Sequence, residues 1–163
     1  MVANIPGSRG ASALIVEFAG ALSRGGVPAA LALLNATVPH RYTALYRLEG
    51  AQLHSVFFHD RLGEPRPEHL AVIDMGDSYC QYVLRDGAFL TDNSAFDQRL
   101  DGHPYQGVMV AYHGVPVLGP GEVLLGTLCH FDTEPRGLTR AQFDLMVQAA
   151  QRLAPWLQPG AGR

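Results

Sequence analysis

Cys80 is the side chain of this chain best placed by its sequence context to do chemistry. It stands two residues after Ser78, which forms a Ser-x-x-Gln capping box with Gln81 at the predicted start of a short helix. A thiol near a helix N-terminus has a lowered pKa and favours the thiolate. The only other cysteine, Cys129, is far away in sequence. A lone cysteine is usually an inert core residue, so we predict that Cys80 is not catalytic.

The chain has seven histidines, but their spacing does not indicate a metal site. His54 and His59 are five residues apart on a predicted strand, so their side chains point to opposite faces and cannot share a metal ion. No HExxH motif occurs. We therefore predict no metal site. Haem on His103 or His113 stays open, because a single axial histidine needs no motif.

Aromatic and polar residues are frequent between Ser78 and Tyr112, on short elements and loops. Such segments on a rigid scaffold are typical of binding sites. The acidic side chains in this segment could hydrogen-bond a ligand or stabilise turns, and the rings could stack on a planar ligand or fill the core.

Length and composition favour one ordinary globular domain in the cytoplasm. The chain has 163 residues and a net charge of -3, and no basic run is longer than two residues, so neither nucleic acid nor a membrane surface is an expected partner. Two cysteines without a CxxC motif are typical of reduced cytoplasmic thiols. We expect no signal peptide, no membrane span and a single domain over residues 11–157, with tails over 1–10 and 158–163.

Hydrophobic periodicity and turn residues predict an α+β fold. The two predicted hairpins favour antiparallel strand pairing, with helices on the faces of the sheet. A Thr139-x-x-Gln142 capping box begins the last helix, and Pro155 should kink or fray it. We expect helices over residues 11–24, 28–38, 78–86 and 140–157, strands over 41–48, 52–59, 88–92, 107–117 and 122–131, and a loop over 61–71.

Three stretches, in chain order, resemble parts of GAF domains, the small-molecule sensor modules of signalling proteins. They are Asp77–Val83 followed by Phe89–Asp92, Tyr112–Val117 with a Gly-x-Pro-apolar motif, and Gly126–Asp132 followed by Pro135–Thr139. The resemblance covers about residues 27–157. It implies a single antiparallel sheet with the terminal helices on one face. The ligand pocket would lie on the other face, under the helix that starts at Ser78 and the segment 93–103.

The resemblance also implies a function and a site. We expect a non-enzymatic bacterial signalling module that binds a small molecule and signals through a homodimer or a separate output protein. The dimer contacts would come from residues 11–24 and 140–157, whose apolar stripes are wider than the sheet requires. The predicted ligand-binding residues are Tyr79, Cys80, Val83, Asp92, Phe96, Asp97, His103 and Tyr112.

Other members of the same family suggest alternatives. Some reduce free methionine sulfoxide with several cysteines, which two cysteines disfavour. Bilin-binding members attach the chromophore to a Cys-His pair, but Cys129-His130 lies in the final strand, so no bilin is expected. The full cyclic-nucleotide signature includes a lysine, and this chain has none, which disfavours cyclic GMP or AMP as the ligand. A purely structural domain with a closed pocket is a further alternative.

Overall fold

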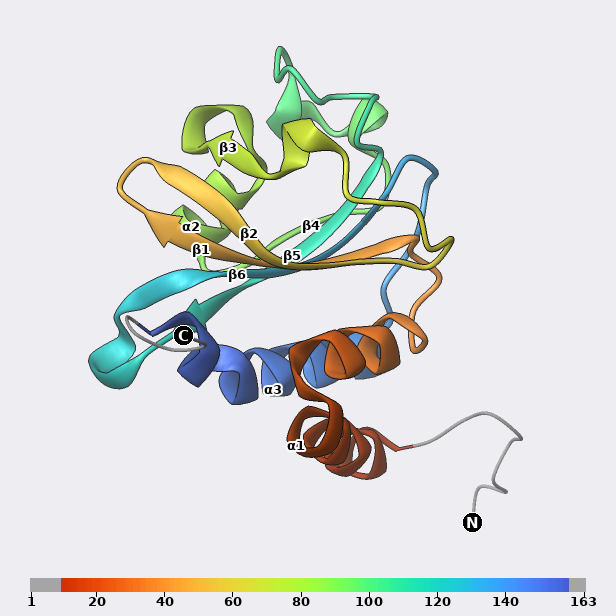
Figure 1. Cartoon of the computed structure of the whole chain (residues 1–163). Coiled ribbons are helices and arrows are strands. Elements are labelled where there is room, and N and C mark those ends of the chain that lie inside the picture. Colours follow the sequence, from red (N-terminus) through yellow and green to blue (C-terminus); the bar gives the residue numbers. More distant parts are fainter. Residues whose placement is uncertain (1–9, 159–163) are drawn as a thin grey trace.

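The computed structural model of the chain describes residues 10–158 and shows three layers. A six-stranded antiparallel sheet separates a layer of long helices from a layer of short elements and loops (Figure 1). This confirms the predicted α+β fold. The expected tails lie almost entirely outside the described residues. The strand order is β3-β2-β1-β6-β5-β4, with β1 at Tyr42–Glu49, β2 at Gln52–Asp60, β3 at Val72–Asp74, β4 at Phe89–Thr91, β5 at Ala111–Leu118 and β6 at Leu124–Asp132.

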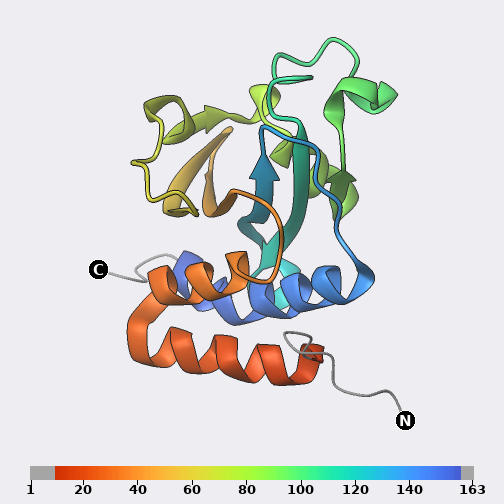
Figure 2. The same cartoon turned by 90° about the vertical axis from the view of Figure 1, so that its right-hand side faces the viewer.

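The first helix, α1 (Ala11–Asn35), has two arms joined by a sharp bend at Gly26. Gly26 has a φ of 74°, a conformation that suits glycine, and Pro28 follows with the fixed φ of a helix start. The break lies between the two helices expected from the sequence. Figure 2 shows the second arm beside the last helix and the first arm farther from the sheet. The first arm buries Ile15, Phe18 and Leu22.

The last helix, α3 (Arg140–Leu157), lies across the sheet and starts as predicted. The Thr139 hydroxyl accepts a hydrogen bond from the Gln142 amide at 3.1 Å, and the Gln142 side chain accepts one from the Thr139 amide at 2.8 Å. The expected kink or fraying at Pro155 does not occur: Pro155 falls in the last helical turn, and the helix runs through it to Leu157. Its apolar stripe packs with the helix-facing sheet residues in one core cluster, which includes Leu45, Val115 and Leu128.

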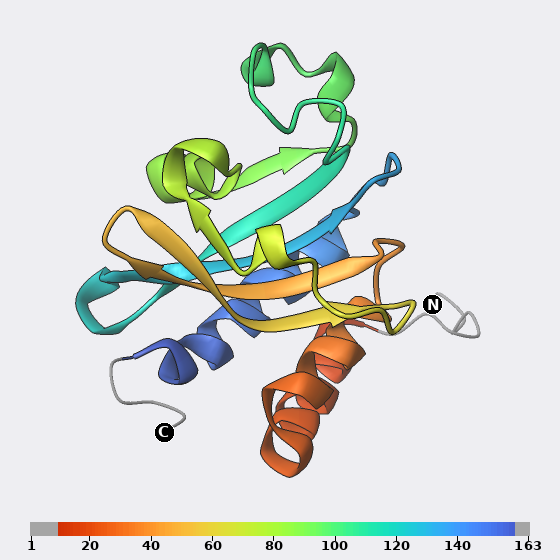
Figure 3. The same ribbon diagram turned by 45° about the horizontal axis from the view of Figure 1, so that its top comes forward.

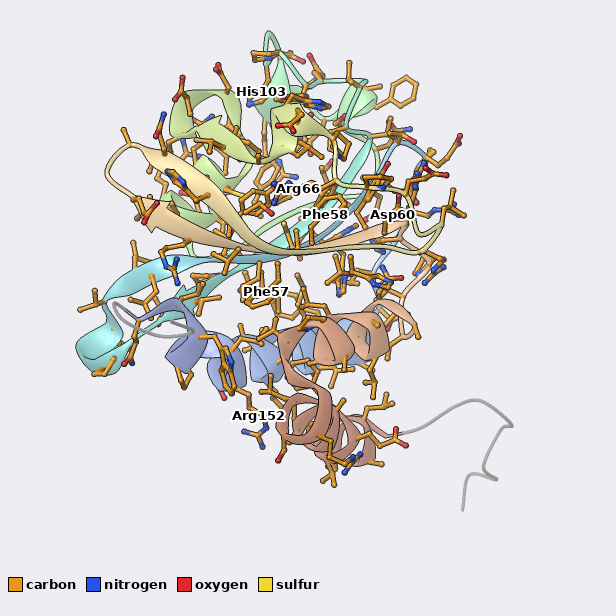
Figure 4. All side chains as sticks on the ribbon, viewed as in Figure 1. Phe57, Phe58, Asp60, Arg66, His103 and Arg152 are labelled. Carbon is orange, nitrogen blue, oxygen red and sulfur yellow. The ribbon has the colours of Figure 1, made fainter. Side chains whose placement is uncertain are left out.

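The opposite face of the sheet is covered by α2 (Cys80–Asp86) and the segment 92–110, while β3 is the edge strand beside β2 (Figure 3). Strand alternation separates the two faces: Phe57 packs against the helix-side core and Phe58 against this second core (Figure 4). Strand β3 is not expected from the sequence. The expected strand 107–117 begins only at Ala111, because the amides of Val108 and Met109 both donate to the Tyr105 carbonyl in a turn.

Two local predictions need adjustment. Glu49 pairs with Gln52, so the hairpin loop is Gly50-Ala51 and not Glu49-Gly50; Gly50 takes a φ of 61°. At α2 the Ser78 hydroxyl accepts a hydrogen bond from the Cys80 amide at 2.9 Å, whereas the Gln81 amide group donates to carbonyls. The Gln81 and Ser78 backbone amides donate to the Ser78 and Met75 carbonyls, so the predicted capping box is not formed.

Residues Ser12–Asn35 of α1 are long and apolar enough to span a membrane, with a mean hydropathy of 1.3. The sequence analysis does not expect such a segment. In the structure this helix is bent at Gly26, and Phe18, Val27 and Leu31 are fully or almost fully buried in the helix-side core. Core helices share the length and composition of membrane spans, and 33% of this segment is buried in the structure.

Candidate functional site

A cavity of about 40 Å³ lies on the face of the sheet opposite the long helices. Its floor is made by Tyr46 of β1, Tyr112 of β5, and Cys129 and Phe131 of β6. Alternation along the strands points these side chains to one face. The start of α2 forms one wall. The other residues that line the cavity, including those of this wall, are Leu70, Ile73, Ser78, Tyr79, Cys80, Tyr105 and Met109.

The cavity is small and mostly lined by rings and aliphatic groups. Its volume has space for about three water molecules. Ile73, Tyr105 and Met109 are half-buried, whereas the floor residues are buried, so these three form the rim on the solvent side. Polar atoms in the wall are confined to a few hydroxyls and the two thiols.

Gly114 lets the Tyr112 ring lie close to the sheet. A Cβ atom at Gly114 would be 2.6 Å from the Tyr112 hydroxyl oxygen and 2.7 Å from its ring. Only glycine therefore fits beneath this ring. The glycine of the Gly-x-Pro motif has a direct role in positioning a cavity side chain.

The Tyr112 hydroxyl lies 3.0 Å from the Cys80 sulfur, and the Thr127 hydroxyl donates to the same sulfur at 3.3 Å. The interaction with the Cys129 thiol is the largest cause that lowers the pKa of Cys80 below the usual value of a thiol, and these hydroxyl groups add to it. Burial is the main cause that raises the pKa of Cys129. The two thiols thus have different protonation preferences.

The residues that close the cavity on the solvent side are held by a few hydrogen bonds from side chains. The Met109 carbonyl accepts hydrogen bonds from the Ser94 hydroxyl at 2.7 Å and the Tyr79 hydroxyl at 3.2 Å. The Tyr46 hydroxyl donates to the Leu70 carbonyl at 3.0 Å. Apart from the short 3-10 turns, residues 92–110 have no helix or strand, so this cover can move at a smaller free-energy cost than the sheet.

The structure brings some of the predicted site residues together. Tyr79, Cys80 and Tyr112 line the cavity, and Val83 is buried beside them in the same core cluster. His103 packs its ring 4.6 Å from that of Tyr79, among the short elements above the sheet (Figure 4).

The other predicted residues lie elsewhere. Asp92, Phe96 and Asp97 border an open, polar surface depression, and Phe96 is 86% exposed. Arg99 pairs with Asp97 at 2.6 Å, and this hydrogen-bonded ion pair is the main cause that lowers the Asp97 pKa to about 2. Asp92 accepts a hydrogen bond from His113 on the other side of the sheet. These three residues are therefore separate from the cavity.

A row of buried histidines on the helix side of the sheet is not predicted from the sequence. His40, His113 and His130 are at most 1% exposed. His40 Nε2 is 2.8 Å from His113 Nδ1, and His113 Nε2 is 2.8 Å from Asp92 Oδ1. The Thr43 hydroxyl is 2.6 Å from His130 Nδ1. No spacing signal reveals the row, because its members come from one loop and two strands.

Burial is the first cause that lowers the pKa of all three histidines, to about 3 for His40. Within residues 10–158, His40 Nδ1 and His130 Nε2 have no hydrogen-bond partner. No group of three or more His, Cys, Asp or Glu side chains in this range could hold a metal ion. His113 uses both ring nitrogens, and the cavity is far smaller than a porphyrin, so these residues do not fit haem.

Comparison with known proteins identifies the fold. No protein-family model and no curated protein matches the sequence. Among solved structures, the GAF domain of an Acinetobacter phosphoenolpyruvate-protein phosphotransferase superposes with a TM-score of 0.74 at 11% identity, over 92% of this chain and 94% of that one. The corresponding domain from Coxiella burnetii gives 0.69 at 13%, over 89% and 90%.

Enzymes are also similar in structure. The free methionine-R-sulfoxide reductase of Neisseria meningitidis, solved with its substrate, gives a TM-score of 0.70 at 12% identity, over 94% of this chain and 91% of that one. The agreement extends over nearly the whole length of each protein, while the sequences have diverged widely. From its sheet order, its terminal helices and these similarities, this chain has the GAF fold.

Proposed function

We propose that this chain is a sensory module that binds a small molecule in the cavity beneath α2 and the segment 105–109. The observation that carries the proposal is a cavity with a rigid floor and a loop-built cover. Each floor strand pairs with a neighbouring strand on both sides, so the floor keeps its shape. A cover held by few hydrogen bonds can change its conformation when a ligand occupies the cavity. Sensing needs both properties.

The lining defines the chemical class of the ligand. The rings of Tyr46, Tyr79 and Phe131 favour an apolar or flat molecule. The groups around Cys80 can hydrogen-bond one polar atom. Space for about three waters is smaller than most organic ligands, so anything larger enters by displacing Tyr105 and Met109.

We further propose that the signal leaves through a homodimer or a separate output protein in the cytoplasm, without enzymatic turnover. The terminal helices support this route because they pack on the back of the sheet that forms the cavity floor. The first arm of α1 has an exposed side that includes Val16, which is 70% exposed. Ile15, expected at the interface from the sequence, is 6% exposed and belongs to the core of the single chain.

Ligand-detected NMR with phenol tests binding in the cavity. Phenol has one ring and one hydroxyl, which match the lining. Met109→Trp should fill the cavity and abolish phenol binding, because Met109 lines it. Val108→Trp is the matched control, since Val108 is 60% exposed and does not line the cavity. Wild type and control should bind alike. Absence of binding, or equal binding by Met109→Trp, would favour a structural domain with a closed pocket.

A second candidate, sulfoxide reduction, is favoured by one observation: Cys80 and Cys129 both line the same small cavity. The reaction would convert two thiols and a sulfoxide into a disulfide, a thioether and water. Free methionine-R-sulfoxide with excess dithiothreitol tests it. Steady methionine release that is lost in Cys80→Ser would establish the enzyme and overturn the sensory proposal.

A further inference from the structure

Two thiols from distant parts of the chain meet at the cavity. Cys80 opens α2 above the sheet, and Cys129 lies in β6 within it. Both line the same small cavity, and neither is in a disulfide. The sequence offers no second cysteine near Cys80, so only the fold provides it with a partner thiol.

The surroundings of the pair assign different roles to the two sulfurs. Burial raises the pKa of Tyr112 well above its usual value, so its hydroxyl keeps its proton and can donate to Cys80. Thr127 donates as well. Two hydroxyl groups stabilise negative charge on the Cys80 sulfur, whereas burial raises the pKa of Cys129 and favours its protonated form. Cys80 is thus the nucleophile, and Cys129 is the resolving thiol.

The size of the cavity selects the oxidant. Space for about three waters admits hydrogen peroxide, which has two non-hydrogen atoms, without movement of the cover. An amino-acid sulfoxide does not fit without such movement. The half-buried rim residues Ile73, Tyr105 and Met109 lie between the thiols and solvent.

We propose that Cys80 and Cys129 form a hydroperoxide-responsive thiol pair that converts reversibly to a disulfide. The inference rests on the proposed sensory function, because it names the chemical class of the molecule that the cavity admits. The Cys80 thiolate attacks one peroxide oxygen, breaks the O–O bond and releases hydroxide, giving a sulfenic acid. The Cys129 sulfur then attacks the Cys80 sulfur, forms the S–S bond and releases water. Overall, two thiols and one hydrogen peroxide give one disulfide and two waters.

The disulfide would change the cavity and its cover. It ties the first turn of α2 to β6 and ends the hydrogen bonds that Cys80 forms with Tyr112 and Thr127. The freed hydroxyls need new partners, so the neighbouring cover around Tyr105 and Met109 must repack. Two equivalents of an external thiol reduce the disulfide and restore the resting pair.

Intact-mass spectrometry after one equivalent of hydrogen peroxide tests the proposal on the full chain. The wild type should lose two hydrogens, and a non-reducing peptide map should show Cys80 linked to Cys129; dithiothreitol should reverse both. Cys129→Ser should gain one oxygen on Cys80, trapped by dimedone, and Cys80→Ser should stay reduced. Two intact thiols in the wild type, at a dose that oxidises glutathione, would overturn the proposal without reliance on any variant.

A rate comparison tests the role of the tyrosine as a positioning residue. Tyr112→Phe should slow oxidation by about tenfold, because a hydrogen bond to a charged group contributes on that order. Tyr82→Phe is the control, since Tyr82 does not line the cavity and should keep the wild-type rate. Equal oxidation rates in the wild type, Tyr112→Phe and Tyr82→Phe would show that Tyr112 does not position the Cys80 thiolate and would overturn its assigned role.

Phenol binding separates this proposal from the sensory one. If the protein binds phenol but keeps both thiols reduced under peroxide, the thiol-pair proposal is wrong and the sensory proposal stands. If it neither binds phenol nor reacts with peroxide, both proposals are wrong.

Discussion

At the residue scale, the site depends on which side chains the strands bring to one position. Tyr79, Cys80 and Tyr112 could be predicted from the sequence because they lie on recognisable motifs. The meeting of Cys80 and Cys129 at one cavity could not, since strand register and the placement of α2 create it. The same holds for the histidine row, whose members are joined by pairing of β5 with β6.

Gly114→Ala should disturb the cavity from beneath. The new methyl group meets the Tyr112 ring at less than van der Waals distance and pushes its hydroxyl away from Cys80. We expect a loss of about 1–3 kcal/mol in the free energy of unfolding, the usual cost of overpacking. Urea denaturation measures it. Gly76→Ala is the control, because no atom lies within 4 Å of the added Cβ; equal effects of the two changes would contradict the packing account.

The histidine row should make the fold sensitive to acid. His40, His113 and His130 have lowered pKa values in the folded state and about 6.5 when unfolded, so below pH 6.5 the unfolded chain binds more protons. Stability is therefore full above pH 6.5 and falls as the pH decreases. Each histidine that stays neutral to pH 5 costs about 2 kcal/mol relative to pH 7.

Urea denaturation at pH 7 and pH 5 checks this loss. His69→Gln, at an exposed site, should leave the pH dependence unchanged. A wild type that loses less than about 1 kcal/mol over this range would show that the row is charged or solvated in the fold.

At the element scale, local signals predicted the order of the main helices and strands well. The bend in α1 follows from Gly26 and Pro28, and the start of α3 from Thr139 and Gln142. The signals fail on the cover, where β3 and residues 107–110 depend on tertiary contacts. Val108 and Met109 have strand-like side chains, yet their amides turn back to Tyr105.

Thr139→Ala should weaken the start of α3 by about 1 kcal/mol, the usual cost of losing a side-chain cap. The Gln142 amide would lose the hydroxyl that it now donates to. Thermal or urea unfolding measures the change. Thr133→Ala is the control at an exposed threonine outside the helix, and it should be neutral. An equally neutral Thr139→Ala would mean that solvent replaces the cap without cost.

At the scale of the whole molecule, the sheet is the layer that separates the cavity on one face from the two terminal helices on the other. The similarity to GAF structures at 11–13% identity shows that this architecture persists when little sequence does. Fold class was therefore accessible from pattern alone. Ligand and output were not, because they depend on a few side chains set on that common frame.

Val16→Glu should convert the proposed dimer to a folded monomer. Val16 is exposed on the first arm of α1, so the charge interrupts a helix–helix contact without entering the core. Light scattering coupled to size exclusion measures the mass. Val123→Glu, at a 58% exposed site on the β5–β6 connection, should remain dimeric. A monomeric wild type at micromolar concentration would contradict signalling through these helices.

The central claim is that occupancy of the cavity moves its cover, and amide hydrogen exchange with and without saturating phenol tests it most directly. The account predicts altered exchange in residues 92–110 and α2, with the floor strands β1, β5 and β6 unchanged, and no effect in Met109→Trp. Phenol that leaves the exchange of residues 92–110 unchanged, or that acts equally on Met109→Trp, would contradict the account.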